Sequence, residues 1–156
     1  MNYTADFLIR QLDLAAHPEG GYYRENYRCD EVSRGRNLAT SIYFLLSEKQ
    51  KSRFHVLKSD EIWYHHAGSA VNIHMIHPDG GYEVKKLGPD LSANEEFHVL
   101  IRKETAFAAD LADKKSFSLV SCVVSPGFTF EDFKLFTYEE LAARFPGHEN
   151  LFREFT

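Results

Sequence analysis

The apolar positions near the N-terminus follow the period of a helix. Thr4 is a residue type that caps helix N-termini, and the run "HPEGG" supplies the Pro and Gly residues that end helices. The spacing between these two signals predicts a helix over about residues 4–16. Its mostly apolar face consists of Phe7, Leu8, Gln11, Leu12 and Ala15.

From about residue 21 to about residue 136 the pattern changes to the two-residue period of strands. In "LATSIYFLLS", for example, Ile42 and Phe44 share one face and Tyr43 lies on the other. The segment "CDEVSRGRN" reads as a loop, and turn signals such as "PDGG" and "ADKK" separate the later runs. Eight or nine strands without intervening helices predict a mainly β fold, an antiparallel sandwich or barrel. The runs are "GYYRENYR", "LATSIYFLLS", "RFHVL", "EIWYHHA", "AVNIHMIH", "YEVKKLG", "FHVLIRK", "TAFAAD" and "FSLVSCVVS".

Helical spacing returns over about residues 137–156. Thr137 and Glu140 form the pattern of a capping box, Leu141 and Phe145 follow at helical spacing, and "PG" ends the run. The segment "HENLFREF" predicts one more short helix. No repeat or low-complexity linker divides the chain, so its 156 residues predict a single domain over 1–156.

Charge and cysteine content narrow the classes of partner. A net charge of -5 and the absence of Lys/Arg blocks argue against a nucleic-acid or membrane partner and favour a small-molecule ligand. Cys29 and Cys122 form no disulfide framework, as is typical of cytoplasmic proteins. The N-terminal segment lacks the apolar core of a signal peptide, so we expect a cytoplasmic location.

The stretch "RFHVLKSDEIWYHHAG" concentrates the chemistry-bearing residues. His55, Glu61 and Gly68 keep the spacing of the first cupin motif. This stretch and the blocks "HPEGGYYRENYR", "TSIYFLL", "LGPDL" and "VSPGFTFEDF" together resemble the cupin_5 (DUF985) family, from about residue 12 to residue 136. The resemblance implies a cupin double-stranded β-helix, or jelly roll, with an N-terminal helix and short C-terminal helices.

The resemblance to metal-loaded cupins implies a metal centre with three histidine ligands and one carboxylate ligand. This sequence keeps only part of that set. Leu57 stands at the second histidine position and Phe107 at the position of the histidine in the second motif, and neither can bind a metal. We therefore expect no metal cofactor. If Fe, Mn, Ni or Zn is held, the ligands implied are His55, Glu61 and His65.

Strand alternation groups the remaining residues. If Glu61 points into the barrel, so do Trp63 and His65, whereas His66 points away. A histidine beside a carboxylate in a partly buried cavity is a general acid–base pair, which would make His55 a base with Glu61 as its partner. The alternative is that both residues are structural and hydrogen-bonded to each other.

Further candidates come from other strands. Tyr23 or Arg24 must face inward if "GYYRENYR" is a strand, and Arg24 could bind a carboxylate or phosphate. Tyr43 is the candidate proton donor, and Glu131 is a candidate supporting group near the ligand. Phe107 and Trp63 would supply flat walls for a ring. His17, His98 and His148 show no partner pattern.

Three functions follow from these residues. The first is an isomerase- or epimerase-like enzyme in which His55 removes a proton next to a carbonyl of a sugar or other small polar substrate. The block "PEGGYYRE" is loosely similar to a segment of the metal-free dTDP-sugar 3,5-epimerases, which use such chemistry. The second is a non-catalytic small-ligand-binding cupin, and the third is a metal-dependent oxygenase or decarboxylase. The resemblance to small cupins also implies a homodimer, formed by strand exchange or by pairing of sheet edges.

Overall fold

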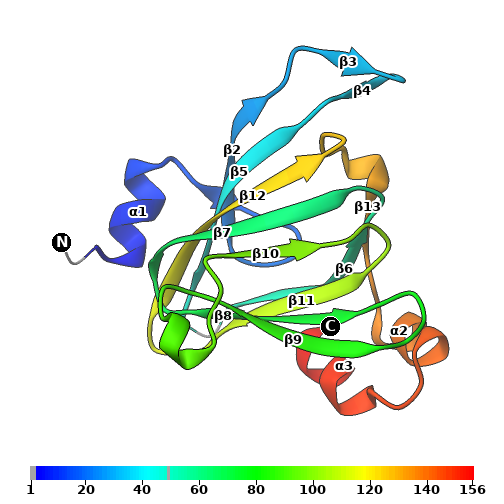
Figure 1. Ribbon diagram of the computed structural model, residues 1–156. Coiled ribbons are helices and arrows are strands. Elements are labelled where there is room, and N and C mark those ends of the chain that lie inside the picture. The colour runs from blue at the N-terminus through cyan, green and yellow to red at the C-terminus, as the bar shows by residue number, and fades with distance from the viewer. Residues whose placement is uncertain (1–2, 49) are drawn as a thin grey trace.

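Two antiparallel sheets form the body of the protein, whose computed structural model describes residues 3–48 and 50–156 (Figure 1). The six-stranded sheet has the order β1-β2-β5-β12-β7-β10, with bounds Ala15–Ala16, Tyr22–Arg28, Thr40–Ser47, Phe117–Ser125, Asp60–Gly68 and His98–Ile101. The five-stranded sheet has the order β13-β6-β11-β8-β9, with bounds Phe133–Leu135, Lys51–Leu57, Ala106–Leu111, Val71–Ile76 and Tyr82–Leu87. The mainly β fold expected from the alternating pattern is confirmed.

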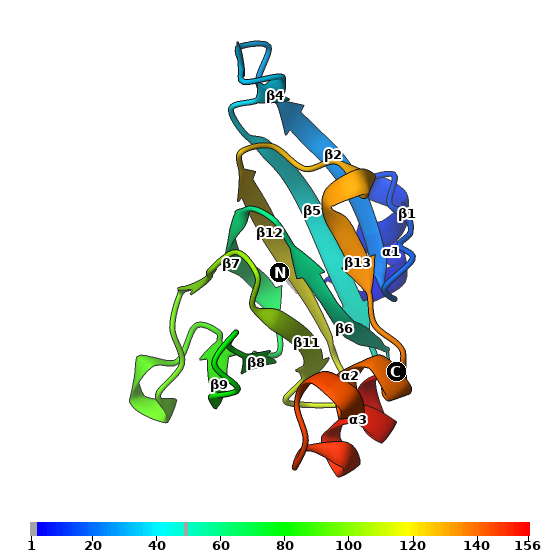
Figure 2. The same cartoon turned by 90° about the vertical axis from the view of Figure 1, so that its right-hand side faces the viewer.

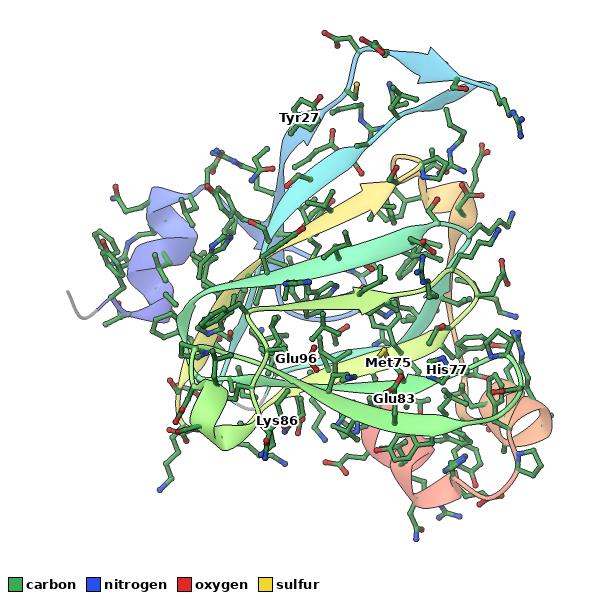
Figure 3. The ribbon with its side chains drawn as sticks, viewed as in Figure 1. Tyr27, Met75, His77, Glu83, Lys86 and Glu96 are labelled. Atoms are coloured by element: carbon green, nitrogen blue, oxygen red, sulfur yellow. The ribbon has the colours of Figure 1, made fainter. Side chains whose placement is uncertain are left out.

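The main core lies between the two sheets and is built from inward residues of both. Phe44 of β5 and Trp63 of β7 meet Ile73 and Met75 of β8 and Phe107 of β11 in one buried cluster. Met75 is drawn on β8 in Figure 3. Because alternate residues of each strand contribute to this cluster, the side-chain period of two decides which residues face the interior.

Three short helices cover the outer faces of the sheets. Helix α1 (Ala5–Gln11) packs beside β5 through Leu8, and α2 (Tyr138–Arg144) and α3 (Glu149–Phe155) pack on the five-stranded sheet (Figure 1). The predicted capping box at the start of α2 is present: Thr137 Oγ1 accepts from Glu140 N, and Glu140 Oε2 accepts from Thr137 N. The C-terminal helices therefore begin where the sequence predicted.

The predicted helix over residues 4–16 is too long. Thr4 does cap α1, but the helix ends at Gln11, because Asp13 adopts a left-handed backbone (φ 52°). Ala15–Ala16 then pairs with Tyr22–Tyr23 as the short strand β1. Apolar spacing continued through this turn because Leu14 also packs against the sheet, in a non-helical conformation.

Two further segments differ from the expected pattern. The stretch "CDEVSRGRN", expected as a loop, contains the hairpin β3 (Val32–Ser33) and β4 (Arg36–Asn37), which projects beyond the barrel (Figure 2). The chain after β12 forms the 3₁₀ turn η2 (Phe130–Asp132) and then β13, which pairs with β6. A second 3₁₀ turn, η1, spans Leu91–Ala93. These elements contain two or three residues each, too few to produce a periodic signal.

Candidate functional site

A cavity of about 360 Å³ opens at one end of the barrel. It lies where β5 and β7 begin and where β6 and β12 end, and the segment 128–133 closes it from one side. Six of its lining residues carry aromatic rings. The rings are those of Tyr23, Phe44, Trp63, Phe128, Phe130 and Phe133. Its polar side chains include His17, Glu19, His55 and Glu61, all of which are at least half-buried.

The turn over residues 17–21 brings an unexpected carboxyl group into this cavity. Backbone bonds join His17 and Gly21, and Arg53 N donates to Glu19 O across 2.9 Å, so the turn lies against β6. Gly20 has φ of 114°, and a Cβ there would lie 2.0 Å from Lys51 O. Only glycine fits this close approach, and the resulting turn buries the Glu19 side chain.

Glu19 and His55 lie in contact at the base of the cavity. His55 Nδ1 lies 2.7 Å from Arg53 O, and because a carbonyl only accepts, Nδ1 carries a proton and donates it. A neutral His55 then presents its Nε2 lone pair to Glu19 Oε2 at 3.2 Å. Two lone pairs would repel at this distance, so a proton between these atoms stabilises the contact, and Glu19 can act as a base only after that proton has left. Ser52 Oγ donates to the other oxygen, Glu19 Oε1, across 2.7 Å.

Burial decides which of the two partners holds that proton. It raises the pKa of Glu19 to about 7, against the lowering effects of His17 and the Ser52 hydroxyl. It lowers the pKa of His55 to about 4, although the bond to Arg53 O favours the protonated imidazole. Both directions place the shared proton on the carboxyl group, which then donates to His55 Nε2.

His17 belongs to the same cluster. Its Nδ1 accepts a hydrogen bond from Glu19 N across 3.3 Å and lies 3.6 Å from Glu19 Oε2. Burial lowers the pKa of His17, and the Glu19 charge opposes this shift. The cluster therefore contains two neutral imidazoles on either side of one carboxyl oxygen.

Glu61 and Trp63 face the cavity from β7, two residues apart on the same side of the strand. Burial raises the pKa of Glu61 to about 8, and the neighbouring Glu19 charge raises it further, while Trp63 and Cys122 oppose the shift. Trp63 is a donor near the Glu61 carboxyl group and lowers its pKa, but neither Glu61 Oε2 nor Trp63 Nε1 completes a hydrogen bond to a described residue. Both atoms are therefore available to a molecule in the cavity.

Two arginines hold the mouth and the closing segment. Arg28 binds both oxygens of Glu25, at 2.8 and 2.7 Å, and its guanidinium also donates to Phe128 O. Arg36, from the β3–β4 hairpin, forms an ion pair with Asp132 and donates to Gly127 O. The hairpin that projects beyond the barrel thus fixes the segment that carries Phe128, Phe130 and Phe133.

The donor set does not fit the cupin metal centre. Leu57 lines the cavity without a lone pair, and the Phe107 ring packs against His55 with centroids 4.0 Å apart, where a ligand histidine would stand. Within residues 3–48 and 50–156, no three His, Cys, Asp or Glu side chains are grouped so that they could hold a metal ion. The set His55, Glu61 and His65 is not assembled either, because His65 lies outside the cavity.

Four of the residues predicted for the site line the cavity together: His55, Glu61, Trp63 and Tyr23. The predicted partnership is different, however, since the carboxyl group in contact with His55 is that of Glu19. Phe107 lies behind the wall, in contact with the rings of both His55 and Trp63.

The structure places the other four predicted residues away from the cavity. Tyr43 packs on the outer face of β5 beside α1, Arg24 is an exposed neighbour of Tyr43 on β2, and Glu131 is exposed in η2. His65 Nε2 lies 3.3 Å from Ser69 O. His65 pairs with the inward Val120, as Trp63 pairs with Cys122, so strand parity is correct for it, but His65 lies further along β7 than the cavity reaches.

Sequence reasoning missed Glu19, His17 and the Glu25–Arg28 pair. The run "HPEGG" was used as a helix stop and as part of the family blocks, but its double glycine also allows the close approach of the backbone to another strand that buries Glu19. His77, which is drawn beside Glu83 in Figure 3, forms an ion pair with it at 2.7 Å on β9 and does not line the cavity. His74 likewise belongs to a separate cluster, with Asp110 and Tyr82.

The two sheets, their order and the cavity between them define a cupin fold. The chain superposes on oxalate decarboxylase from Bacillus subtilis with a TM-score of 0.62 at 15% identity, over 93% of this chain and 37% of that one. Such a likeness shows the fold alone. The chain belongs to the Cupin_5 family, described as "Cupin superfamily (DUF985)", whose model matches residues 6–136.

Relatives of similar size support this assignment. Protein SO0799 from Shewanella oneidensis is 43% identical, with a TM-score of 0.95 over 99% of this chain and 98% of that one. A hypothetical protein from Leishmania major is 34% identical, with a TM-score of 0.91 over 99% of each chain. The uncharacterized protein YML079W of Saccharomyces cerevisiae is 30% identical over 144 residues, which is 80% of this chain and 71% of the yeast protein.

None of the helices in the described residues is long and apolar enough to cross a membrane.

Proposed function

We propose that the cavity binds a small molecule and transfers a proton next to its carbonyl group, with Glu19 as the base and Glu61 as the acid. The observation that supports this proposal is the contact of Glu19 Oε2 with His55 Nε2, 3.2 Å apart at the base of the cavity, with His55 Nδ1 committed to Arg53 O. A carboxyl group whose pKa is raised to about 7 is poised to take and return a proton near neutral pH.

The base role passes from His55, where the sequence suggested it, to Glu19. His55 Nδ1 is committed to Arg53 O, and burial holds the pKa of its ring at about 4, so His55 is a weak base. When Glu19 accepts a proton from a substrate carbon, its new O–H bond donates to His55 Nε2. His55 is thus a positioning residue, and Ser52 fixes the other oxygen of the base.

Glu61 supplies the complementary group. Because burial and the Glu19 charge raise its pKa to about 8, it is protonated near neutral pH and can donate to a carbonyl oxygen. In the forward step the substrate C–H bond breaks, Glu19 gains the proton, and the electron pair forms an enol whose oxygen takes the Glu61 proton. When a proton returns to carbon, the enol oxygen gives its proton back to Glu61 and the carbonyl group re-forms. Return to the neighbouring carbon is isomerisation, and return to the opposite face is epimerisation.

Hydrogen–deuterium exchange tests the proposal without knowledge of the natural substrate. The exchange of the α-protons of cyclohexanone and of 2-tetralone is followed by proton NMR in D₂O near neutral pH. We expect the wild-type protein to accelerate exchange of at least one ketone, and Glu19→Gln to reduce the acceleration at least ~100-fold. Glu139→Gln, an exposed change in α2, is the matched control and should leave the rate unchanged.

A second candidate function is non-catalytic binding of a small ligand in the same cavity. The near-complete burial of Glu19 and His55 favours it, because hydrogen-bonded buried pairs also serve structure alone. Equal exchange rates in the wild type and Glu19→Gln would contradict proton transfer and leave binding as the function.

A further inference from the structure

Two unpartnered polar atoms distinguish one wall of the cavity. Glu61 is 6% exposed and Trp63 is 1% exposed, yet Glu61 Oε2 and Trp63 Nε1 bond to no described residue. The other buried atoms without partners belong to Arg36, Thr105 and Ser118, none of which lines the cavity. Buried polar groups normally have partners, so the pair on β7 indicates where a bound molecule supplies them.

The chemistry of the two atoms specifies what the molecule must offer. The indole N–H of Trp63 only donates, so the ligand must present an acceptor. The Glu61 carboxyl group accepts when ionised and donates when protonated. A carbonyl oxygen, alone or within an amide, satisfies Trp63 and can also engage Glu61, because an amide offers both an acceptor and a donor.

The charges around the cavity exclude an anionic ligand. Among the described residues that line it, Arg28 is the only Lys or Arg, and Glu25 already binds it through both oxygens. Glu19 and Glu61 line the same cavity, offer no positive charge, and repel a carboxylate or phosphate whenever they are ionised. The diphosphate of a nucleotide sugar is disfavoured for the same reason, because its binding needs cationic side chains that are not already paired.

The aromatic side chains in the cavity wall favour a ligand with a flat ring. Phe44 and Trp63 pack together with centroids 5.4 Å apart, and Phe128, Phe130 and Phe133 contact one another across the closing segment. Such surfaces bind ring faces and offer no further polar partners.

We propose that Glu61 and Trp63 form a carbonyl-binding subsite, and that the ligand of the cavity is an uncharged, flat ring compound bearing a carbonyl group. This inference rests on the proposed function, because it takes the cavity as the ligand site. It adds the substrate class and the orientation: the carbonyl oxygen lies at Glu61 and Trp63, and the ring lies among the phenylalanines.

Three compounds of the same shape test the substrate class: benzamide, benzoate and benzamidine carry a neutral, an anionic and a cationic head on one ring. The chain has a single tryptophan, Trp63, so its fluorescence reports on the cavity, with isothermal titration calorimetry as a second measurement. We expect benzamide to bind at least ~10-fold more tightly than the other two. Tighter binding of benzoate or benzamidine, or no binding of benzamide, would overturn the proposal.

Variants test the two subsite residues. Trp63→Phe keeps the ring and removes the N–H, and Glu61→Leu removes the carboxyl group; calorimetry should show each weakening benzamide binding by about tenfold. Unchanged benzamide affinity in both folded variants would overturn the subsite. Circular dichroism checks the fold, and Trp63→Phe keeps the test decisive where Glu61→Leu does not fold.

Glu25→Gln is the matched charge variant at the mouth. It frees Arg28 from its carboxylate partner, so the ratio of benzoate to benzamide affinity should rise by about tenfold. An unchanged ratio would contradict the role given to the Glu25–Arg28 pair in excluding anions. If benzamide binds but the protein does not accelerate ketone exchange, proton transfer by Glu19 is contradicted and the carbonyl-binding subsite stands. The two proposals can therefore fail separately.

Discussion

Glu19 Oε2 lies 3.2 Å from His55 Nε2, and the turn that carries Glu19 is bonded to the strand that carries His55. This contact places an ionisable carboxyl group inside the barrel without a cationic partner, since His55 is neutral and burial lowers its pKa. The stability of the protein must therefore depend on pH in a way that surface carboxylates do not produce.

Stability should fall as pH rises from 6.5 to about 8.5. The pKa of Glu19 is raised to about 7 and that of Glu61 to about 8, so the folded state holds protons that the unfolded state releases near pH 4.5. Their contribution is complete below pH 4.5 and is lost as pH passes through the folded values. His55, with its folded pKa of about 4, acts in the opposite direction only below 6.5.

Urea unfolding at steps of pH, followed by Trp63 fluorescence, measures this dependence. We expect the free energy of unfolding to drop by about 2 kcal/mol over the interval in the wild type, and Glu61→Gln to remove most of the drop. Glu139→Gln should reproduce the wild-type slope. A wild-type stability that is flat or rises above pH 6.5 would show that these carboxyl groups ionise normally.

Gly20→Ala should disrupt the turn that presents Glu19. The added Cβ would lie 2.0 Å from Lys51 O, so the turn must move away from β6 in addition to adopting a strained φ. We expect a loss of about 2–4 kcal/mol in thermal or urea unfolding. Gly35→Ala is the matched control, because Gly35 also has a positive φ (78°) but nothing within 4 Å of the new Cβ, and should cost only about 1 kcal/mol. Equal losses would mean that the turn is not pressed against β6.

Local geometry explains which parts of the site were predictable from the sequence. Glu61 and Trp63 share a face because alternation in a strand is fixed by covalent geometry, and both do line the cavity. The same rule gives the correct face for His65, opposite the core residue Val120, but parity does not say how far along the strand the cavity extends, and His65 lies beyond it. Parity also could not place Tyr43, since both faces of β5 are buried and its apolar residues do not alternate with polar ones.

Glu19 illustrates what sequence patterns leave out. Its partners, Ser52 and His55, lie on a strand that is distant in the chain, and only the tertiary packing of the turn against β6 brings them together. The position of the aromatic closing segment over the cavity likewise depends on distant residues, Arg28 and Arg36. Long-range contacts of this kind carry no periodic signal.

Purified protein should contain less than about a tenth of an equivalent of Fe, Mn, Ni or Zn by elemental analysis. The reason is the donor set, since Leu57 and Phe107 occupy two of the four ligand positions and His55 is bonded to Glu19. The double variant Leu57→His/Phe107→His restores both imidazoles and should retain more metal than the wild type. Stoichiometric metal in the wild-type protein would contradict the prediction.

The protein should form a homodimer, and the outer face of β7 and β10 is the surface that argues for it. Leu100 on β10 is 40% exposed and Phe97, just before that strand, is 57% exposed, so apolar area faces solvent beside the exposed Tyr64. The edge strand β9 differs, because Lys85 and Glu96 form an ion pair there, and charges of this kind discourage strand pairing. Size-exclusion chromatography with light scattering should give twice the chain mass of 18.0 kDa, and Leu100→Glu should shift the protein towards monomer. A wild-type mass of 18.0 kDa at all concentrations would show that this surface remains exposed.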